Sequence, residues 1–338
     1  MTTLPPPRPL RPVLRRMALG LALAVLGGLV AWRGATFSPT PGLETTLTPL
    51  EVPLDGPLPF DYAQAATLRF EANRANLLLN PLPPRSPLLL SGEARHRTRN
   101  PVNVSVRRAG RNVNVTTKLY VQALPNDRVL PPSPEPFQHS LRASLTPTLP
   151  LSLNTLTVGG NQTINLAGLR LRALSARSDS GRLDLALPSR PGGPYALVTR
   201  SGRVEVTAPQ GATPEALRVN SQSGDLQLEL GGAVVDALNA GTQSGNVALT
   251  LPRQVNRGTV TTASGDVQID VPPATRGNLD IRTVSGDVTL RVPPGLRVRV
   301  RFTDRETLLL PPGTPAASSP QLDVFVDTAS GEFNLQDD

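Results

Sequence analysis

The chain lacks cysteine entirely and has few aromatic residues. Aromatic side chains make up 3% of its 338 residues, whereas there are 37 prolines. Without thiols, disulfide cross-links, cysteine nucleophiles and thiolate metal sites are excluded. A core of stacked Val, Leu and Ile side chains needs few rings, so the composition favours such a core over a small aromatic one.

Histidine is also scarce, with His96 and His139 the only two in the chain. His96 stands between arginines and His139 lies in a proline-rich segment, settings in which we expect solvated side chains. A nucleophile–histidine triad would therefore lack its general base. The chain has no phosphate-binding glycine loop and no zinc-ligand spacing. The sequence thus predicts a non-enzymatic protein without catalytic residues, cofactor or metal.

What the chain does contain is a repeat centred on glycine, as in NSQSGDLQLEL, TTASGDVQIDVP and RTVSGDVTLRVP. Successive glycines are 20 to 22 residues apart, except for a last gap of 45, which we interpret as two periods with a glycine-free coil near Asp304. A fixed period of about 20 residues is typical of a solenoid, in which each repeat packs only against its neighbours. The predicted turn glycines are Gly160, Gly181, Gly202, Gly224, Gly245, Gly265, Gly286 and Gly331.

Within one repeat, apolar and polar residues alternate on both sides of the glycine. In residues 277–294, Leu279 and Ile281 precede Gly286, and Val288 and Leu290 follow it. Alternation of this kind predicts half-buried strands, glycine at positive φ supplies a tight corner, and proline closes the second strand. A hairpin array is conceivable, but a repeat this short favours an all-β fold built as a parallel β-solenoid with coils of about 21 residues.

A basic and then apolar segment opens the chain. Four arginines fall in residues 1–16, and residues 17–37 form an apolar run that predicts a transmembrane signal-anchor. The arginine excess predicts a single-pass protein of the cytoplasmic membrane with its N-terminus inside and its bulk outside. A cleaved signal peptide is the alternative, although the cleavage sites after Ala31 and Ala35 are poor.

The rest of the chain divides by composition. Residues 38–59 are rich in Pro and Thr and predict a linker, and residues 125–150 predict a second, proline-rich connector. Between them, residues 60–124 alternate like strands and predict a smaller β region, packed on the solenoid or continuous with it. Residues 151–338 are assigned to the solenoid itself.

These repeats resemble known bacterial families. The serial SGDV phrases from about 174 to 335 resemble the β-strand-repeat family labelled "putative adhesin". The stretch LTVGGNQTINLAGLRLRALSARSDSGRLDLAL, residues 156–187, is similar to the toast-rack domain of cell-wall-active antibiotic response proteins, with its usual upstream β segment at 66–106. The resemblance implies a β-repeat fold, and it implies little about function because the shared motifs are structural turns.

Two surfaces could carry a ligand. Arg95, Arg97 and Arg99, and likewise Arg297, Arg299 and Arg301, alternate along predicted strands, so each set falls on one face and could bind an anionic ligand. An ordinary solvated strand face is the competing interpretation. Outside the first 33 residues the formal charge falls from +8 to about +3, which argues against a dedicated polyanion binder.

The second surface is the residue after the glycine. Asp225, Asn246, Asp266 and Asp287 should stack coil upon coil. The functional interpretation is a calcium site or a catalytic stripe, and the structural one is that Asp and Asn suit a tight corner. Arg182 and Arg203 at the same place in earlier coils favour the structural interpretation.

The sequence therefore predicts a membrane-anchored, extracytoplasmic β-solenoid that acts as a non-catalytic binding or scaffolding module of the cell envelope. Its expected partners are the membrane, through the N-terminal helix, and an anionic envelope polymer or another envelope protein. Nucleic acid is not expected, because the protein is exported and lacks aromatic stacking residues. The alternatives are an accessory protein of an envelope-stress or antibiotic response and a β-helical polysaccharide-processing enzyme.

Overall fold

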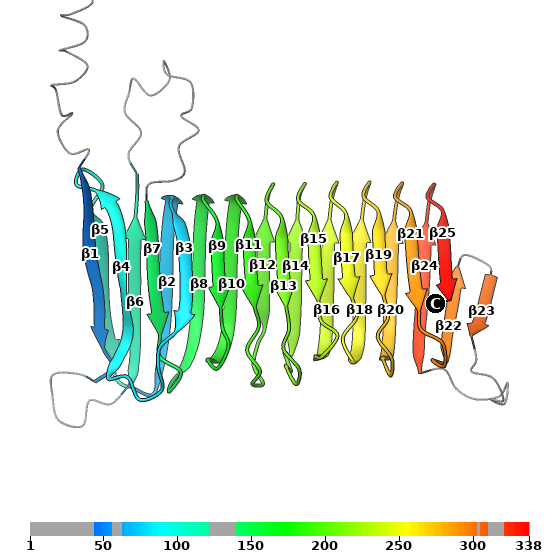
Figure 1. The fold of residues 1–338 in the computed structure, drawn as a ribbon, viewed down its shortest axis with the longest axis horizontal. Helices are drawn as coiled ribbons and strands as arrows, with labels where there is room; N and C mark the ends of the chain where they lie inside the picture. The colour runs from blue at the N-terminus through cyan, green and yellow to red at the C-terminus, as the bar shows by residue number, and fades with distance from the viewer. Residues whose placement is uncertain (1–43, 56–62, 122–138, 303–304, 310–320, 338) are drawn as a thin grey trace, which may run out of the picture. The chain divides into compact units, whose positions relative to one another are not determined.

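Two long β-sheets face each other and enclose one continuous core (Figure 1). The computed structural model describes residues 44–55, 63–121, 139–302, 305–309 and 321–337. From Thr45 onward, the described residues belong to one compact unit. The predicted transmembrane segment 17–37 lies outside the described residues. Among those described, no helix has the length and apolar character needed to span a bilayer.

Sheet A has twelve strands in the order β1-β4-β7-β3-β9-β11-β13-β15-β17-β19-β21-β25. Their bounds are β1 (Thr45–Pro53), β3 (Asn76–Pro81), β4 (Leu88–Arg97), β7 (Ser140–Leu145), β9 (Gln162–Asn165), β11 (Leu183–Ala186), β13 (Val204–Thr207), β15 (Leu226–Glu229), β17 (Val247–Thr250), β19 (Val267–Asp270), β21 (Val288–Val292) and β25 (Phe333–Asp337).

Sheet B has thirteen strands in the order β23-β22-β24-β20-β18-β16-β14-β12-β10-β8-β2-β6-β5. Their bounds are β2 (Ala65–Arg74), β5 (Val102–Ala109), β6 (Asn112–Leu119), β8 (Pro150–Gly159), β10 (Arg170–Ser180), β12 (Tyr195–Thr199), β14 (Ala216–Ser221), β16 (Val234–Thr242), β18 (Gln254–Thr262), β20 (Arg276–Thr283), β22 (Val298–Phe302), β23 (Arg305–Leu309) and β24 (Leu322–Thr328).

Each coil contributes one strand to each sheet, as the alternation predicts. Strand β18 runs in sheet B to the Gly265 corner, and β19 returns in sheet A to a proline-rich corner. Neighbouring coils pair in parallel, so that Val267 lies beside Val247 on one side and Val288 on the other. All three side chains are buried, and such ladders of Val, Leu and Ile fill the interior. The all-β parallel solenoid expected from the repeat is confirmed for the described residues.

The predicted linker and connector both contain sheet strands, which corrects those boundaries. Strand β1 falls inside residues 38–59, and its Leu50 and Val52 are each 1% exposed. Strand β7 falls inside residues 125–150 and pairs with both β3 and β4. The proline content of these segments had suggested linkers. Strand β1, however, lies at the edge of its sheet, where a missing N–H group is tolerated.

The interpretation of the 45-residue gap as two coils is wrong. Strand β25 pairs directly with β21, and β24 pairs directly with β20, so only one coil follows Gly286. The intervening residues form an antiparallel pair, β22 and β23, beyond β24 at the end of sheet B. This pair lacks the Thr/Ser-x-Ser-Gly corner of the other coils, and it extends sheet B only.

Tyr195 is the one tyrosine buried in the described core, and its hydroxyl has no hydrogen-bond partner among the described residues. Burial raises its pKa to about 12. Because an unpartnered buried hydroxyl costs about 1–3 kcal/mol, we expect Tyr195→Phe to unfold at the same temperature as the parent or higher. Tyr120→Phe is the matched comparison: its hydroxyl donates to Glu71 Oε2 at 2.6 Å, so the same change should lower the melting temperature. A loss of stability in Tyr195→Phe would contradict this account.

Candidate functional site

The repeated phrase is explained by the corner that it builds. In the coil of Gly265, the Thr262 hydroxyl accepts from the Gly265 N–H at 2.9 Å, and the Ser264 hydroxyl donates to the Gln243 carbonyl of the preceding coil at 3.4 Å. The same two bonds recur at the corners of Gly202, Gly224, Gly245 and Gly286. The Thr/Ser-x-Ser-Gly sequence is therefore a structural device, and it satisfies polar groups both within a coil and between coils.

The glycines themselves are required for a different reason from the one predicted. Positive φ occurs at Gly160 and Gly181, but Gly202, Gly224, Gly245, Gly265, Gly286 and Gly331 do not adopt it. Instead, a Cβ on Gly265 would lie less than 3.0 Å from the Gly245 carbonyl oxygen, and every corner from Gly181 to Gly331 meets the preceding corner in the same way. Close approach of stacked backbones, rather than left-handed conformation, excludes side chains from this column.

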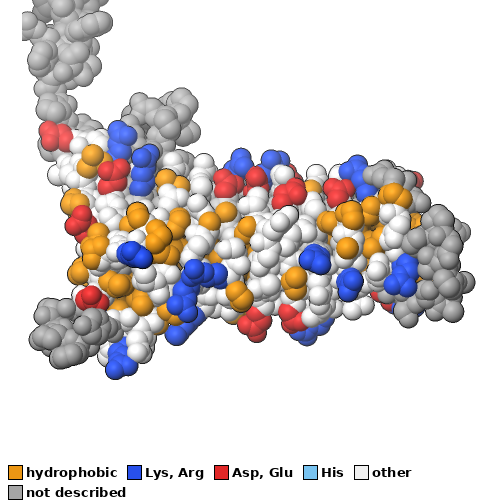
Figure 2. Space-filling view, turned by 60° about the horizontal axis from the view of Figure 1, so that its bottom comes forward, with side chains coloured by type: hydrophobic (Ala, Val, Ile, Leu, Met, Phe, Trp, Pro, Cys, Tyr) orange, Lys and Arg blue, Asp and Glu red, His pale blue; other side chains and the backbone are white. Residues whose placement is uncertain are grey.

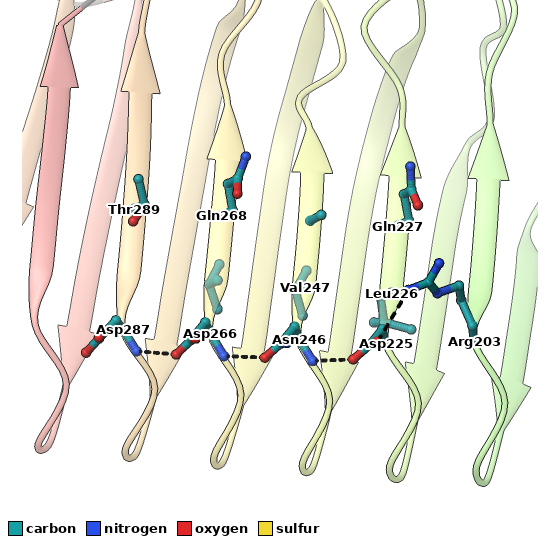
Figure 3. A pocket seen from close by; sticks show the side chains of 12 residues that line it. Arg203, Asp225, Leu226, Gln227, Asn246, Val247, Asp266, Gln268, Asp287 and Thr289 are labelled. Atoms are coloured by element: carbon teal, nitrogen blue, oxygen red, sulfur yellow. Dashed lines mark hydrogen bonds and ion pairs between the residues drawn. The ribbon is translucent and has the colours of Figure 1, made fainter.

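The residue after the glycine forms a ladder of side-chain-to-backbone bonds (Figure 3). Asp225 Oδ1 accepts from the Asn246 N–H, Asn246 Oδ1 from the Asp266 N–H, and Asp266 Oδ1 from the Asp287 N–H, at 2.9 to 3.0 Å. Asp287 Oδ1 accepts in turn from the Glu332 N–H. The carboxylates of the stripe thus connect successive coils, which supports the structural interpretation of these residues.

The ladder borders a shallow groove of about 480 Å³ on sheet A, lined also by Gln227, Gln268 and Arg203. Arg203 takes the ladder position in its coil and forms an ion pair with Asp225 at 3.7 Å. No group of three or more His, Cys, Asp or Glu side chains within the described ranges is arranged to hold a metal ion. The carboxylates of Asp225 and Asp266 and the Asn246 amide oxygen, which line this groove, are thus already engaged in bonds between coils.

The two predicted arginine sets do not form one surface. Arg95 and Arg97 belong to β4 near one end of sheet A, with Arg99 in the turn that follows, whereas Arg299 and Arg301 belong to β22 near the opposite end of sheet B.

Arg299 and Arg301 both bind Asp323 on β24, so two of the three arginines of this set share one carboxylate. Burial alone would raise the pKa of Asp323, but the hydrogen bonds from both arginines outweigh it and hold the pKa below its ordinary value.

The histidines are buried rather than solvated, which corrects that prediction. His96 is 5% exposed, and its Nε2 lies 2.7 Å from the Thr48 hydroxyl, while its Nδ1 lies 2.9 Å from the Arg97 carbonyl. His139 is 8% exposed and lies 3.4 Å from the Asn100 amide. Burial, followed by the charges of Arg97, His96 and Arg99, lowers the pKa of His139.

This lowered pKa predicts acid sensitivity. The unfolded chain binds a proton at His139 near pH 6.5, and the folded chain does so only at lower pH, so stability should fall as the pH drops below about 6.5. Melting temperatures measured at pH 7.5 and 5.5 should therefore differ more for the parent than for His139→Gln. An equal difference in the two proteins would show that His139 does not cause the loss.

Charge is segregated along the solenoid, although the formal charge outside the first 33 residues is only about +3. The described residues from 44 to 178 carry 14 arginine or lysine and five acidic side chains, whereas residues 179–302 carry 13 and 11. The first group contains strands β1 to β9 and most of β10, and the second contains the last two residues of β10 and strands β11 to β22. The N-terminal section of the rod is thus the basic one.

The most developed polar surface in this section crosses three strands of sheet B. The register of β5, β6 and β2 aligns their outward side chains in rows. One row is Asn103, Lys118 and Glu71, the next is Ser105, Thr116 and Arg69, and in the third Arg107 lies beside Asn114. We call this set the polar grid: Asn103, Ser105, Arg107, Asn114, Thr116, Lys118, Arg69 and Glu71. Together these side chains line an open groove of about 580 Å³.

Glu71 orders the cations of the polar grid. Its carboxylate is buried, with the side chain 4% exposed, and it pairs with Arg69 and with Lys118 at 3.2 Å. The hydrogen bond from Tyr120 is the main cause that lowers the pKa of Glu71, against the opposing effect of burial. With Glu71 ionised, the three cations leave the grid with a net positive charge, and the amides and hydroxyls lie between them.

Sequence reasoning missed the polar grid, although part of a signal was present. Asn103, Ser105 and Arg107 alternate with valines, and Asn114, Thr116 and Lys118 alternate with Val113, Val115 and Thr117. Alternation fixes one polar face on each segment, but the pairing of β2 with β6 is parallel and joins residues 47 positions apart. No local pattern predicts that pairing.

The comparisons agree with the repeat architecture. Residues 214–336 match the family model described as Toastrack DUF4097. These coils resemble toast-rack proteins. The toast-rack match covers the SGD repeats from β14 onward and leaves the basic N-terminal section outside it.

Two solved structures also resemble the chain. A protein described as a putative cell adhesion protein, from Clostridium sporogenes, is 9% identical over 87% of this chain and 100% of its own, with a TM-score of 0.28. A putative adhesin from Bacteroides fragilis is 11% identical over 87% of this chain and 98% of its own, with a TM-score of 0.39. At these scores neither likeness bears on ligand or mechanism. No curated protein matches the chain.

Proposed function

We propose that this protein is a non-catalytic, adhesin-like binding module of the cell envelope that holds acidic glycans on the polar grid. The observation that carries the proposal is the grid itself. Arg69, Arg107 and Lys118 supply positive charge, and Asn103 and Asn114 supply amides on the same exposed face. Guanidinium and ammonium groups suit phosphate or carboxylate substituents, and the amides and hydroxyls suit sugar hydroxyl groups.

The shape of the surface supports binding rather than turnover. The groove is open along three strands and contains one carboxylate, Glu71, which already has three partners. A glycosidase needs a second carboxyl group facing the first across the scissile bond. The polar grid offers an extended polymer a line of weak contacts, which is how a flat module gains affinity for a repeating ligand.

The envelope location is part of the proposal. It is supported by the arginine-rich residues 1–16 and the apolar residues 17–37, which predict a single-pass anchor with the rod outside the cytoplasmic membrane. The toast-rack match is consistent with a module of this kind and assigns no chemistry to it.

Binding to a polyanionic glycan tests the proposal. Full-length protein should bind immobilised polygalacturonate more tightly than dextran, and raising salt to physiological strength should weaken that binding. Arg107→Gln combined with Lys118→Gln should weaken it about tenfold, because two exposed charge contacts contribute roughly 0.7 kcal/mol each. Arg69 and Tyr120 remain in this variant to hold Glu71.

The matched control changes two arginines on the same face of sheet B beyond the basic section. Arg257→Gln combined with Arg282→Gln removes the same charge and should leave the affinity unchanged, with melting temperatures confirming that both variants fold. Equal losses in the two double variants would show that only net charge matters. If the affinity changed neither with salt nor in the Arg107→Gln, Lys118→Gln variant, the polar grid would be excluded as the binding site.

A further inference from the structure

A second pocket, unrelated to the polar grid, lies among the proline-rich corners, at the edge of the solenoid opposite the glycine corners. Its floor is apolar and contains Pro81, Leu82, Pro84 and Pro147. These residues come from the corners after β3 and β7, which are neighbouring strands of sheet A. The pocket has a volume of about 610 Å³, within the range of pockets that hold small ligands.

Three arginines border this floor, and no carboxylate does. Arg85, Arg170 and Arg190 line the pocket, each from a different corner, and all three are exposed. No ion pair involves them within the described part of the chain. Arg85 has a φ of +71°, which a non-glycine residue seldom adopts. The turn that presents this arginine therefore holds a strained backbone.

The floor is poor in hydrogen-bond donors. Its prolines have no N–H group, and the Leu82 N–H already donates to the Leu145 carbonyl at 2.7 Å. The Thr148 hydroxyl is engaged with Thr146 at 2.8 Å. The donors of the pocket are therefore concentrated on its three arginines, whereas the proline residues offer none and suit a hydrocarbon chain.

We propose that this pocket binds an anionic amphiphile, with the hydrocarbon on the proline floor and a phosphate or carboxylate head among Arg85, Arg170 and Arg190. Figure 2 turns this edge of the rod toward the viewer, and hydrophobic and basic side chains gather on its left, N-terminal part. Charge complementarity selects the head group, and the absence of polar groups on the floor selects an apolar tail. The site is independent of glycan binding on sheet B.

A photo-reactive dodecyl phosphate, with the reactive group at the end of the chain, tests this proposal on the full-length protein. Below its micelle concentration, cross-links mapped by mass spectrometry should concentrate at residues 81–85, 147–148 and 167–170. The same chain carrying a phosphocholine head should label these corners much less. Arg170→Gln combined with Arg190→Gln should lower the corner yield about fivefold, as expected for the loss of two surface charge contacts.

Two further variants distinguish binding in the pocket from non-specific electrostatic attraction of the probe to the protein surface. Arg253→Gln combined with Arg276→Gln makes the same change at later proline corners and should leave the yield at 81–85 unchanged. Ala167→Glu places a carboxylate at an exposed position of the pocket and should abolish labelling without unfolding the protein. Equal labelling by the two probes would overturn the proposal, as would unchanged labelling in both the double variant and Ala167→Glu.

Discussion

Gly265→Ala is expected to destabilise the rod by at least 1–3 kcal/mol, which is about the cost of overpacking a rigid core. The new methyl group would meet the Gly245 carbonyl oxygen, and that oxygen cannot move without shifting the next coil. Because each coil packs on its neighbours, the loss should extend beyond the altered corner. Chemical denaturation, with hydrogen exchange to map the affected coils, measures both effects.

Two controls separate close approach from backbone conformation. Gly231→Ala adds a methyl group that makes only ordinary contacts of 3.5 Å, and it should change the stability by less than about 1 kcal/mol. Gly265→Asn should be as harmful as Gly265→Ala, because Asn tolerates positive φ but still carries a Cβ. If Asn were tolerated at this position, left-handed conformation rather than stacking would be the reason for glycine.

Thr262→Val is the second substitution with a large expected effect. The side chains have nearly the same shape, but valine cannot accept the bond from the Gly265 N–H. Thr262 is 5% exposed, so the change leaves a buried donor without its partner and should cost about 1–3 kcal/mol.

Thr261→Val, one residue earlier on the exposed face of β18, is the control and should change the stability by no more than about 0.5 kcal/mol. Thermal melts of the two variants provide the comparison. Similar melting temperatures for Thr261→Val and Thr262→Val would show that the hydrogen bond to the Thr262 hydroxyl does not stabilise the corner.

The solenoid could be predicted from the sequence because its information is local and repeated. Alternation around Gly286 gives the two strands and their buried faces, and the period gives the stacking. The strands β1 and β7 could not be predicted in this way. Each lies in a proline-rich segment, and each is stabilised by partners distant in the sequence, as in the pairing of Leu50 with Gly92.

The candidate sites were less predictable than the fold. Alternating arginines at 297–301 indicated a cationic face, but whether its members are paired depends on the neighbouring strand, and here Asp323 binds both Arg299 and Arg301. For the polar grid the reverse holds. None of its three strands has a distinctive pattern by itself, and the proposed surface forms only because β6 pairs with β2 and with β5. Long-range pairing is the information that composition and periodicity lack.

The fixed corner has a consequence for how such a chain can change over evolution. From Gly202 onward every glycine corner has the same four-residue form, while the chain between one corner and the next ranges from 16 to 41 residues. Any insertion at the glycine edge would break two ladders at once, so growth is confined to the opposite edge. At that edge, differences in length are accommodated by longer corners and by register shifts near the starts of β10 and β18. New binding surfaces can therefore arise among the proline-rich corners, while the glycine corners keep the stacking of the coils unchanged.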